Sequence, residues 1–350
     1  MRTLISLILG TCLLLSYSVK RTAARTDLII ANGQMPGMAK DKDGHLHLVY
    51  GTGDSIMYAL SSDLGRTFSH PSLIAVVPKL YAFANRGPQV AVVSTGMLVT
   101  ATTSLGNIYA FRKVTGGKWM SVGKVNDREA TAKEGLMALS ADGNQAFAVW
   151  LDLRDNERNK IYGSRSDDGG RTWSKNRLVY TSPDTTVCEC CKPSAVVKGK
   201  RVYVMFRNWL HGNRDLYLIQ SYDGGNTFGP AQKLGRGSWK LNGCPMDGGG
   251  LAVNENGAVY TVWKRERNIY AAMPGMAESL LGQGSGCTVE AMNGKNVYAW
   301  VENGEVVYVN LQGEKKILGP GKQPVLKALD NGQAVCAWEN RKQIHASVIE

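Results

Sequence analysis

The chain has 350 residues, with 41 lysines and arginines against 29 acidic residues and a formal net charge of +12. A basic protein of this size favours acidic partners such as anionic glycans, nucleic acid or phospholipid, unless the excess charge is only a solvated surface. The sequence has no run of Lys and Arg with interleaved aromatic residues, so nucleic acid is not an expected partner.

The N-terminal segment has the pattern of a secretory signal. An apolar run from Leu4 to Leu15 follows a basic residue and precedes small and basic residues. Because the run is too short to span a bilayer comfortably, we expect a signal peptide at residues 1–24 and one domain over residues 25–350. The protein is then exported (periplasmic, cell-surface or secreted), keeps no stable membrane span, and has a formal charge of +9. Lipidation of Cys12 is the weaker alternative, because Thr11 stands where a small residue such as Gly or Ala is expected.

The rest of the chain consists of short segments rich in Val, Ile, Tyr and Trp between Gly- and Asp-rich turns, without a sustained helical period. A strand that ends in an aromatic residue is repeatedly followed by a loop and a short strand resembling Ile-Tyr-Ala. The strand ends are Tyr50, Trp150, Phe206, Trp263, Trp300 and Trp338, with Thr100 in the equivalent place. The short strands are residues 56–59, 108–110, 161–163, 216–218, 269–271, 307–309 and 344–346. The chain therefore contains seven copies of one unit.

Seven such units predict an all-β protein, a β-propeller of four-stranded antiparallel blades. Radial repetition leaves no exposed sheet edge, and roughly 40 to 45 residues per blade is the usual period. The last unit has only three strands, whereas residues 27–31 form a spare strand ahead of the first unit. We therefore expect the N-terminal strand to complete the seventh blade, with a six-bladed propeller as the alternative.

One eight-residue phrase, Ser-x-Asp-x-Gly-x-Thr followed by Phe or Trp, occurs at residues 61–68, 166–173 and 221–228. Its Asp is suited to bond nearby backbone N–H groups, and its Gly to supply a positive φ. The phrase resembles the Asp-box of the BNR repeat, a β-hairpin turn of sialidases (neuraminidases) and of several other propeller proteins. The resemblance implies a sialidase-like propeller whose boxes lie between the two outer strands of a blade, on the face away from the active site. Sialidase catalytic domains have six blades, so the count of seven departs from that pattern.

The candidate site residues lie on the opposite face, in loops that enter the first strand of a blade or join its second and third strands. A sialidase-type reaction needs arginines for the substrate carboxylate, a carboxylic acid for the leaving group and a Tyr nucleophile. The candidates for substrate binding are Arg86, Arg154, Arg207, Arg214 and Arg265. The candidate catalytic acids are Glu134, Asp152 and Asp247.

Two parts of the sialidase pattern are missing. The tyrosines Tyr162, Tyr217 and Tyr270 lie within third strands instead of at the entry to an inner strand. The Arg-Ile-Pro phrase is also absent, and its nearest equivalent, residues 86–88, lies in the second unit. The arginines have a structural alternative, which is ion pairing between neighbouring loops.

The mature chain has an even number of cysteines, which in an exported protein indicates disulfides. They are Cys188, Cys190, Cys191, Cys244, Cys287 and Cys336. The first five open the fourth, fifth and sixth units, so we expect them to converge on one rim of the central channel. Adjacent cysteines pair poorly, and a bridge from Cys190 or Cys191 to Cys244 is the simplest expectation. Cys336 lies inside a strand and is interpreted as a small core residue.

A soft-metal site is the alternative use of the cysteine group. Thiolates of Cys188, Cys190, Cys191, Cys244 and Cys287 are the candidate ligands, and Met246, Met35 and Met38 are candidate thioether ligands. Sulfur ligands suit Cu(I) better than a hard cation. The spacing lacks the paired Cys-x-x-Cys of a zinc ribbon.

Three functions follow as hypotheses. The leading one is an exported sialidase-like propeller that binds an acidic saccharide or another anionic small molecule at an arginine-rich mouth. It needs no cofactor and, if catalytic, is a glycoside hydrolase of exo-sialidase type. The second is a non-catalytic propeller with a copper or other soft-metal site. The third is a scaffold that docks another exported protein on its rim.

Overall fold

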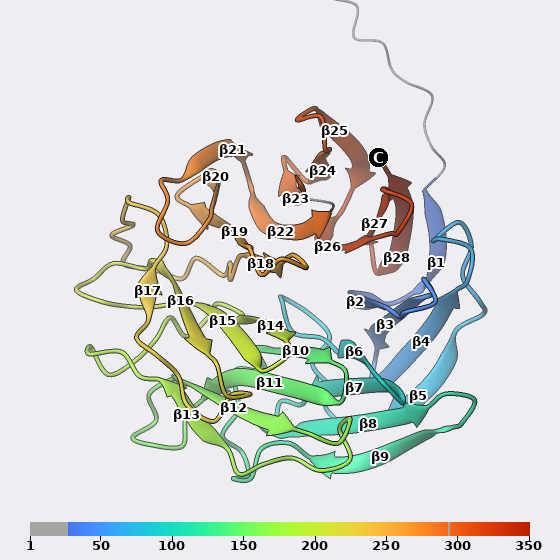
Figure 1. Ribbon diagram of the computed structural model, residues 1–350, viewed down its shortest axis with the longest axis horizontal. Coiled ribbons are helices and arrows are strands. Elements are labelled where there is room, and N and C mark those ends of the chain that lie inside the picture. The colour runs from blue at the N-terminus through green and yellow to red at the C-terminus, as the bar shows by residue number, and fades with distance from the viewer. Residues whose placement is uncertain (1–26, 293–294) are drawn as a thin grey trace, which may run out of the picture.

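The computed structural model describes residues 27–292 and 295–350, and these residues form strands and no helix. The strands make seven four-stranded antiparallel sheets arranged radially around a central axis (Figure 1). The prediction of an all-β propeller with seven blades is confirmed, and the six-bladed alternative is wrong. The predicted signal peptide lies outside the described residues.

Each blade takes its strands in chain order from the channel outward, except the last. Blade 1 consists of β2 (Gln34–Lys40), β3 (Leu46–Thr52), β4 (Ser55–Ser61) and β5 (Ser72–Val76). Blade 2 consists of β6 (Gln89–Val93), β7 (Gly96–Thr102), β8 (Ile108–Val114) and β9 (Trp119–Lys124). Blade 3 consists of β10 (Met137–Asp142), β11 (Gln145–Asp152), β12 (Lys160–Ser166) and β13 (Arg177–Tyr180). Blade 4 consists of β14 (Ser194–Lys198), β15 (Arg201–Arg207), β16 (Leu216–Ser221) and β17 (Gln232–Lys233). Blade 5 consists of β18 (Gly250–Val253), β19 (Val259–Arg265), β20 (Asn268–Ala272) and β21 (Ser279–Gln283). Blade 6 consists of β22 (Ser285–Met292), β23 (Lys295–Glu302), β24 (Glu305–Val309) and β25 (Lys315–Pro320).

The seventh blade closes the ring with both ends of the chain. Its strands are β26 (Lys322–Ala328), β27 (Ala334–Asn340), β28 (Gln343–Ile349) and, on the outside, β1 (Leu28–Asn32). Leu28 lies opposite Ala346, and Asn32 lies opposite Gln343. The prediction that the N-terminal strand completes the last blade is therefore confirmed, and the first and last strands hold the ring together.

The hydrophobic core lies between neighbouring blades. A second strand such as β11 is buried along almost its whole length because sheets cover both of its faces. Its terminal aromatic, Trp150, is fully buried, as are Trp300 and Trp338 at the equivalent places. The repeated aromatic strand end in the sequence thus marks a packing position between blades.

The three Asp-boxes connect the third and fourth strands of blades 1, 3 and 4, as the resemblance implied. In the first box, Ser61 Oγ donates to Asp63 Oδ1 (2.8 Å), and Gly65 N donates to Ser61 Oγ (2.9 Å). Thr67 donates from both its backbone N and its Oγ1 to the Asp63 carboxylate. The same bonds recur in the other two boxes. Each box is therefore a turn closed by its own side chains.

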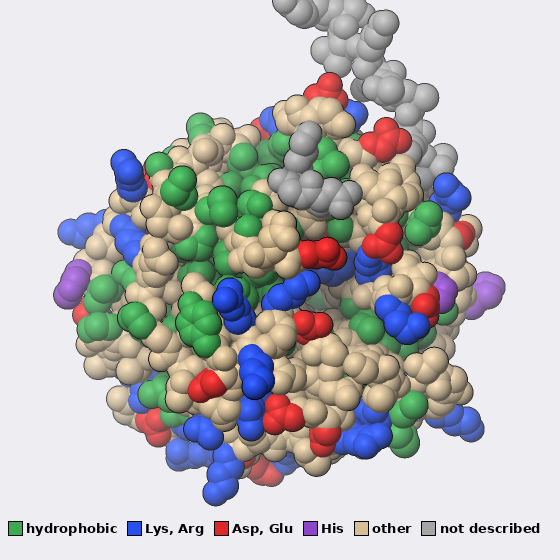
Figure 2. Space-filling view, viewed as in Figure 1, with side chains coloured by type: hydrophobic (Ala, Val, Ile, Leu, Met, Phe, Trp, Pro, Cys, Tyr) green, Lys and Arg blue, Asp and Glu red, His purple; other side chains and the backbone are tan. Residues whose placement is uncertain are grey.

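The seven inner strands enclose a channel of about 830 Å³. Charged residues of both signs line it: Lys40, Asp142, Lys192, Lys198, Glu255, Glu290, Lys327 and Asp330. Figure 2 shows basic and acidic side chains mixed around the central opening on one face of the molecule. Within residues 27–292 and 295–350, no helix is long and apolar enough to cross a bilayer.

Candidate functional site

On the face opposite the Asp-boxes, the connections between blades differ in length. Long loops, residues 77–88, 125–136, 181–193 and 234–249, lead into the inner strands of blades 2 to 5. Single residues, by contrast, join blade 5 to blade 6 and blade 6 to blade 7. The long loops and the neighbouring strand ends carry almost all of the residues predicted to form a site, so the site occupies one side of the channel mouth.

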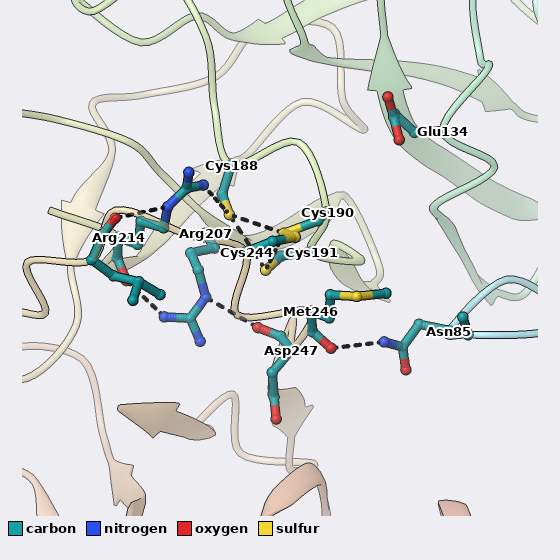
Figure 3. Close-up of a disulfide and its surroundings, with 12 residues drawn as sticks. Asn85, Glu134, Cys188, Cys190, Cys191, Arg207, Arg214, Cys244, Met246 and Asp247 are labelled. Carbon is teal, nitrogen blue, oxygen red and sulfur yellow. Dashed lines mark hydrogen bonds between the residues drawn. A yellow bond between two sulfur atoms is a disulfide. The ribbon is translucent and has the colours of Figure 1, made fainter. Parts of the chain in front are cut away.

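Of the five cysteines that the sequence predicts to converge, four lie together. Cys188, Cys190 and Cys191 lie in the loop before β14, and Cys244 lies in the loop before β18. Cys190 and Cys244 form a disulfide across the two blades (Figure 3). This is one of the two bridges expected from the sequence. We call Cys188, Cys190, Cys191 and Cys244 the cysteine rim.

The two free thiols of the cysteine rim lie beside this bridge. Cys188 Sγ is 3.4 Å from Cys191 Sγ and 3.8 Å from Cys190 Sγ, and Cys190 Sγ is 4.0 Å from Cys191 Sγ. Cys188 and Cys191 are almost completely buried, whereas Cys244 is exposed and Cys190 is partly exposed. The rim thus has a bridge that reaches solvent and a dithiol that does not.

The two buried thiols differ in electrostatic environment. The neighbouring thiol of Cys191 lowers the pKa of Cys188 to about 6, against the opposing effect of burial, and Arg214 and Arg207 act in the same direction as Cys191. Arg214 Nη1 donates a 3.0 Å hydrogen bond to Cys188 Sγ. Burial raises the pKa of Cys191, and the neighbouring Cys188 raises it further. These surroundings therefore favour the thiolate form on Cys188 over that on Cys191.

Arg207 is a structural clamp beneath the cysteine rim. It is 1% exposed, and it donates to three backbone carbonyls, those of Asp247 (3.0 Å), Arg214 (2.7 Å) and Lys264 (2.9 Å). The guanidinium also lies 5.5 Å from the ring centroid of Trp239. All of its nitrogens thus bond the protein itself.

Asp247 and Cys287 form a separate buried group. The Asp247 carboxylate is 2% exposed and accepts hydrogen bonds from Gly286 N (2.7 Å) and Gly249 N (3.2 Å). Cys287 Sγ lies 4.0 Å from Asp247 Oδ1, and burial raises the pKa of this thiol. The fifth cysteine therefore contacts a carboxylate and does not join the sulfur group found among the described residues. Cys336 is buried in the core between blades 6 and 7, as expected.

Arg86 and Glu134 are paired at the mouth. Arg86 donates through Nε to the backbone carbonyl of Glu134, and its Nη2 lies 3.7 Å from Glu134 Oε2. The guanidinium is also held against the rings of Tyr81 and Phe83. Burial raises the pKa of Glu134, although the positive charge of Arg86 opposes this. Glu134 is 30% exposed, which makes it the most accessible of the three predicted acids.

Asp152 and Arg154 form a second paired group. Asp152 is completely buried and accepts hydrogen bonds from Trp150 Nε1 (2.7 Å), Thr131 Oγ1 (2.9 Å) and Arg154 Nε (2.9 Å). The guanidinium of Arg154 lies 4.2 Å from the ring centroid of Tyr162. These contacts fix the two loops of blade 3.

Arg265 is paired with Glu278 at 2.6 Å and lies over the ring of Tyr270. Each of the five predicted arginines therefore bonds groups of the protein in its own or a neighbouring loop. Arg86, Arg154 and Arg265 form the ion pairs that the structural alternative predicts. Arg207 and Arg214 form none among the described residues, and bond backbone carbonyls and, for Arg214, a sulfur. None of the five arginines lines the channel or the pocket at its mouth.

Lys192 is a residue that the sequence argument did not single out. It lines a pocket of about 230 Å³ at the channel mouth, together with Asn85, Gln89 and Asp247. Its Nζ donates to Gln89 Oε1 (2.9 Å), and burial lowers the pKa of the amine to about 8. In the sequence, only its position indicates a role: Lys192 follows Cys191 directly and precedes Pro193, the last residue before β14.

Neither family models nor curated proteins match this sequence. Several solved structures share its fold. Virginiamycin B lyase from Staphylococcus aureus aligns over 93% of this chain and 98% of its own, with a TM-score of 0.55 and 12% identity. A fungal alcohol oxidase of the AA5 family, in complex with copper, aligns over 93% of this chain and 75% of its own, with a TM-score of 0.53 and 11% identity.

The NanB sialidase from Streptococcus pneumoniae is also similar, over 93% of this chain and 70% of its own, with a TM-score of 0.48 and 13% identity. At these identities, the similarity to the lyase and to the oxidase shows the fold alone. A shared propeller does not imply a shared activity, so the function has to be argued from the site.

Proposed function

We propose that this protein is an exported, non-hydrolytic propeller of the Asp-box type that binds one soft metal ion, Cu(I), at the cysteine rim. The three closed boxes in a propeller support its place among Asp-box proteins, and the pattern of residues 1–24 supports export. The observation that carries the metal assignment is the mutual spacing of three sulfurs.

The sulfur spacing matches a shared metal ion. The distances among Cys188, Cys190 and Cys191 Sγ are 3.4, 3.8 and 4.0 Å. Sulfurs that each lie about 2.3 Å from one tetrahedral metal ion are separated by about 3.8 Å. Cys244, which is bonded to Cys190, is near enough to become the fourth ligand once the bridge is reduced. Thiolates favour Cu(I) over hard cations, and the bound ion would fix the two loops to each other.

The charges around the rim support an anionic sulfur site. Three or four thiolates on one monovalent ion leave a net negative charge, which is costly to bury without compensation. Arg214 donates directly to Cys188, and Arg207 lies beneath the same loops. Two of the arginines expected to bind a substrate carboxylate thus supply the positive charge that the thiolates need.

The candidate methionines differ in their distance from the cysteine rim and in the direction of their side chains. Met38 packs in the core between blades 1 and 7 and is unsuited to ligate the rim. The Met246 side chain is exposed and extends away from the sulfurs toward Asn85, whose Nδ2 donates to the Met246 carbonyl (Figure 3). We therefore assign the four cysteines, without a thioether, as the ligand set.

The proposed site requires reduction of the Cys190–Cys244 bridge. Exposed disulfides are the more easily reduced ones, and Cys244 is exposed. With the bridge intact, only Cys188 and Cys191 remain as thiols at the rim. Metal binding is therefore coupled to the redox state of the compartment.

An anaerobic titration of the reduced protein with Cu(I), against a chromophoric competitor, tests this function. We expect one tight equivalent in the wild type and in Cys336→Ser, whose thiol is in the core. Cys188→Ser and Cys191→Ser should lose that equivalent, and protein with the bridge intact should bind more weakly. A reduced wild type that takes up no Cu(I), or serine variants that bind like the wild type, would overturn the proposal.

A second candidate, binding of an acidic saccharide or another anionic small molecule, rests on Lys192. Within the part of the chain that the structure describes, its amine bonds only the neutral Gln89 side chain, and the residue lines the mouth pocket. A carboxylate is the group that such an amine would bind. Binding of a sialoside, measured by calorimetry on the wild type and on Lys192→Met, tests this candidate. Turnover of a fluorogenic sialoside by the wild type would instead support hydrolysis.

A further inference from the structure

The cysteine rim combines a disulfide that reaches solvent with two thiols that do not. Cys188 Sγ lies 3.8 Å from Cys190 Sγ, which is one half of the bridge, and 3.4 Å from Cys191 Sγ. Cys188 is therefore placed between a disulfide that it could attack and a thiol that could attack it in turn. No other free cysteine of the described residues belongs to this group.

We propose that the cysteine rim is an internal thiol–disulfide relay, in which the bridge moves between the exposed pair Cys190–Cys244 and the buried pair Cys188–Cys191. This exchange goes beyond metal binding and does not require it. The relay would make a buried dithiol accessible to redox partners that can touch only the surface.

The relay has two steps. In the first, the Cys188 thiolate attacks Cys190 Sγ; the Cys188–Cys190 bond forms, the Cys190–Cys244 bond breaks, and Cys244 leaves as a thiolate. In the second, the Cys191 sulfur, after losing its proton to a leaving thiolate or to water, attacks Cys188 Sγ. The Cys188–Cys191 bond forms, and Cys190 leaves as a thiolate. One disulfide is present throughout, so no external oxidant or reductant is consumed.

The surroundings of Cys188 favour the first step. Arg214 Nη1 donates to Cys188 Sγ at 3.0 Å, and a cation at hydrogen-bond distance stabilises the thiolate, which is the attacking form. Cys244, the first leaving group, is exposed, so water stabilises its thiolate. Because the attacking and attacked cysteines lie in one short loop, the reaction requires no rearrangement of the blades.

Labelling of the native, oxidised protein with a bulky maleimide reports on the relay. The free cysteines of the described residues, Cys188, Cys191, Cys287 and Cys336, are buried. In a chain that begins at residue 25, the reagent therefore reaches a thiol only when Cys190 and Cys244 are released. Cleavage after Glu189 separates Cys188 from Cys190 and Cys191, and mass spectrometry of the fragments then identifies the bridge. In the wild type we expect labels on Cys190 and Cys244 and a new Cys188–Cys191 linkage.

Three variants separate the relay from simple local opening. In Cys188→Ser, labelling of Cys244 is lost and the Cys190–Cys244 bridge persists. In Cys191→Ser, the exchange stops after one step, which gives one label on Cys244 and a Cys188–Cys190 linkage. Cys336→Ser behaves like the wild type. A wild type that stays unlabelled, or one labelled on Cys188 or Cys191 with the original bridge intact, would overturn the relay. None of these outcomes depends on a metal, so the relay and the proposed Cu(I) site fail independently.

Discussion

Arg214, which the sequence pattern assigns to a substrate carboxylate, donates a 3.0 Å hydrogen bond to the sulfur of Cys188. The guanidinium is 6% exposed and lies 4.2 Å from the ring centroid of Trp209. The Cys188 sulfur and the positive charge that bonds it are thus parts of one buried unit. This contact connects the two features that the sequence presents separately, the arginines and the cysteines.

Arg214→Ala should weaken Cu(I) binding by the reduced protein. Hydrogen bonds to charged groups contribute about 1.5–3 kcal/mol, so the dissociation constant should rise by about 10- to 100-fold. The competitor titration measures this change. Arg201→Ala is the matched control, because Arg201 is exposed at the start of β15, the end of the strand opposite Arg207, and lies over the Tyr222 ring. Equal affinity in the wild type and Arg214→Ala would show that the guanidinium does not stabilise the site.

Asp152→Asn should destabilise the fold without a specific effect on ligand binding. The carboxylate is completely buried and neutralises Arg154. Removing one partner of a buried ion pair costs about 3–5 kcal/mol where the other charge stays uncompensated. Because Arg154 keeps its ion pair with Asp127, we expect a loss near or below the lower end of that range. Urea unfolding measures the loss. Asp155→Asn is the control, since Asp155 is about half exposed. A stable Asp152→Asn that loses only a catalytic activity would instead assign this residue to catalysis.

The repeat, the strands and the closure of the ring could be predicted from the sequence, because they depend on local patterns. Each Asp-box is closed by its own hydrogen bonds, and an aromatic strand end recurs in six of the seven blades. The candidate site was harder to predict. Arg207 donates to three backbone carbonyls and does not face solvent, because loops of two blades pack around it. This packing cannot be predicted from a local sequence pattern. The pairing of Cys244 with Cys190 instead of Cys191 likewise depends on how these loops pack against each other.

The Asp-boxes should make stability depend on acid pH. Burial alone would raise the pKa of Asp168, but hydrogen bonds from Thr172, Ser166 and Arg171 hold it at about 2, below its ordinary value of 3.8. A carboxyl whose pKa is lowered on folding contributes stability above its unfolded pKa, and this contribution is lost as the pH falls through the folded value.

Melting temperature, measured as the pH falls from about 4 to about 2, checks this effect of Asp168. The wild type should lose stability over this interval. Asp168→Asn should be less stable at neutral pH and should show a smaller loss on acidification. Asp167→Asn is the neighbouring control, because Asp167 is exposed and pairs with Arg165 at the surface. A wild type and an Asp168→Asn variant with parallel pH profiles would contradict the prediction.

Removal of β1 should open the seventh blade. The strand pairs with β28 through Leu28, Ile29, Ala31 and Asn32, and Asp27 Oδ2 lies 2.7 Å from His345 Nδ1. Each backbone hydrogen bond contributes about 1 kcal/mol net, so a chain that begins at Gly33 should lose a few kcal/mol relative to one that begins at residue 25. The exposed edge of β28 should also promote association between chains.

Hydrogen exchange of the β28 amides separates loss of closure from general destabilisation. Ala346, which lies opposite Leu28, should exchange faster in the shortened chain. Val149, in the middle of β11 and remote from the closing blade, should keep its protection until the whole propeller unfolds. Equal acceleration at both positions would mean that the blades unfold as one unit, and unchanged protection at Ala346 would show that the ring closes without its N-terminal strand.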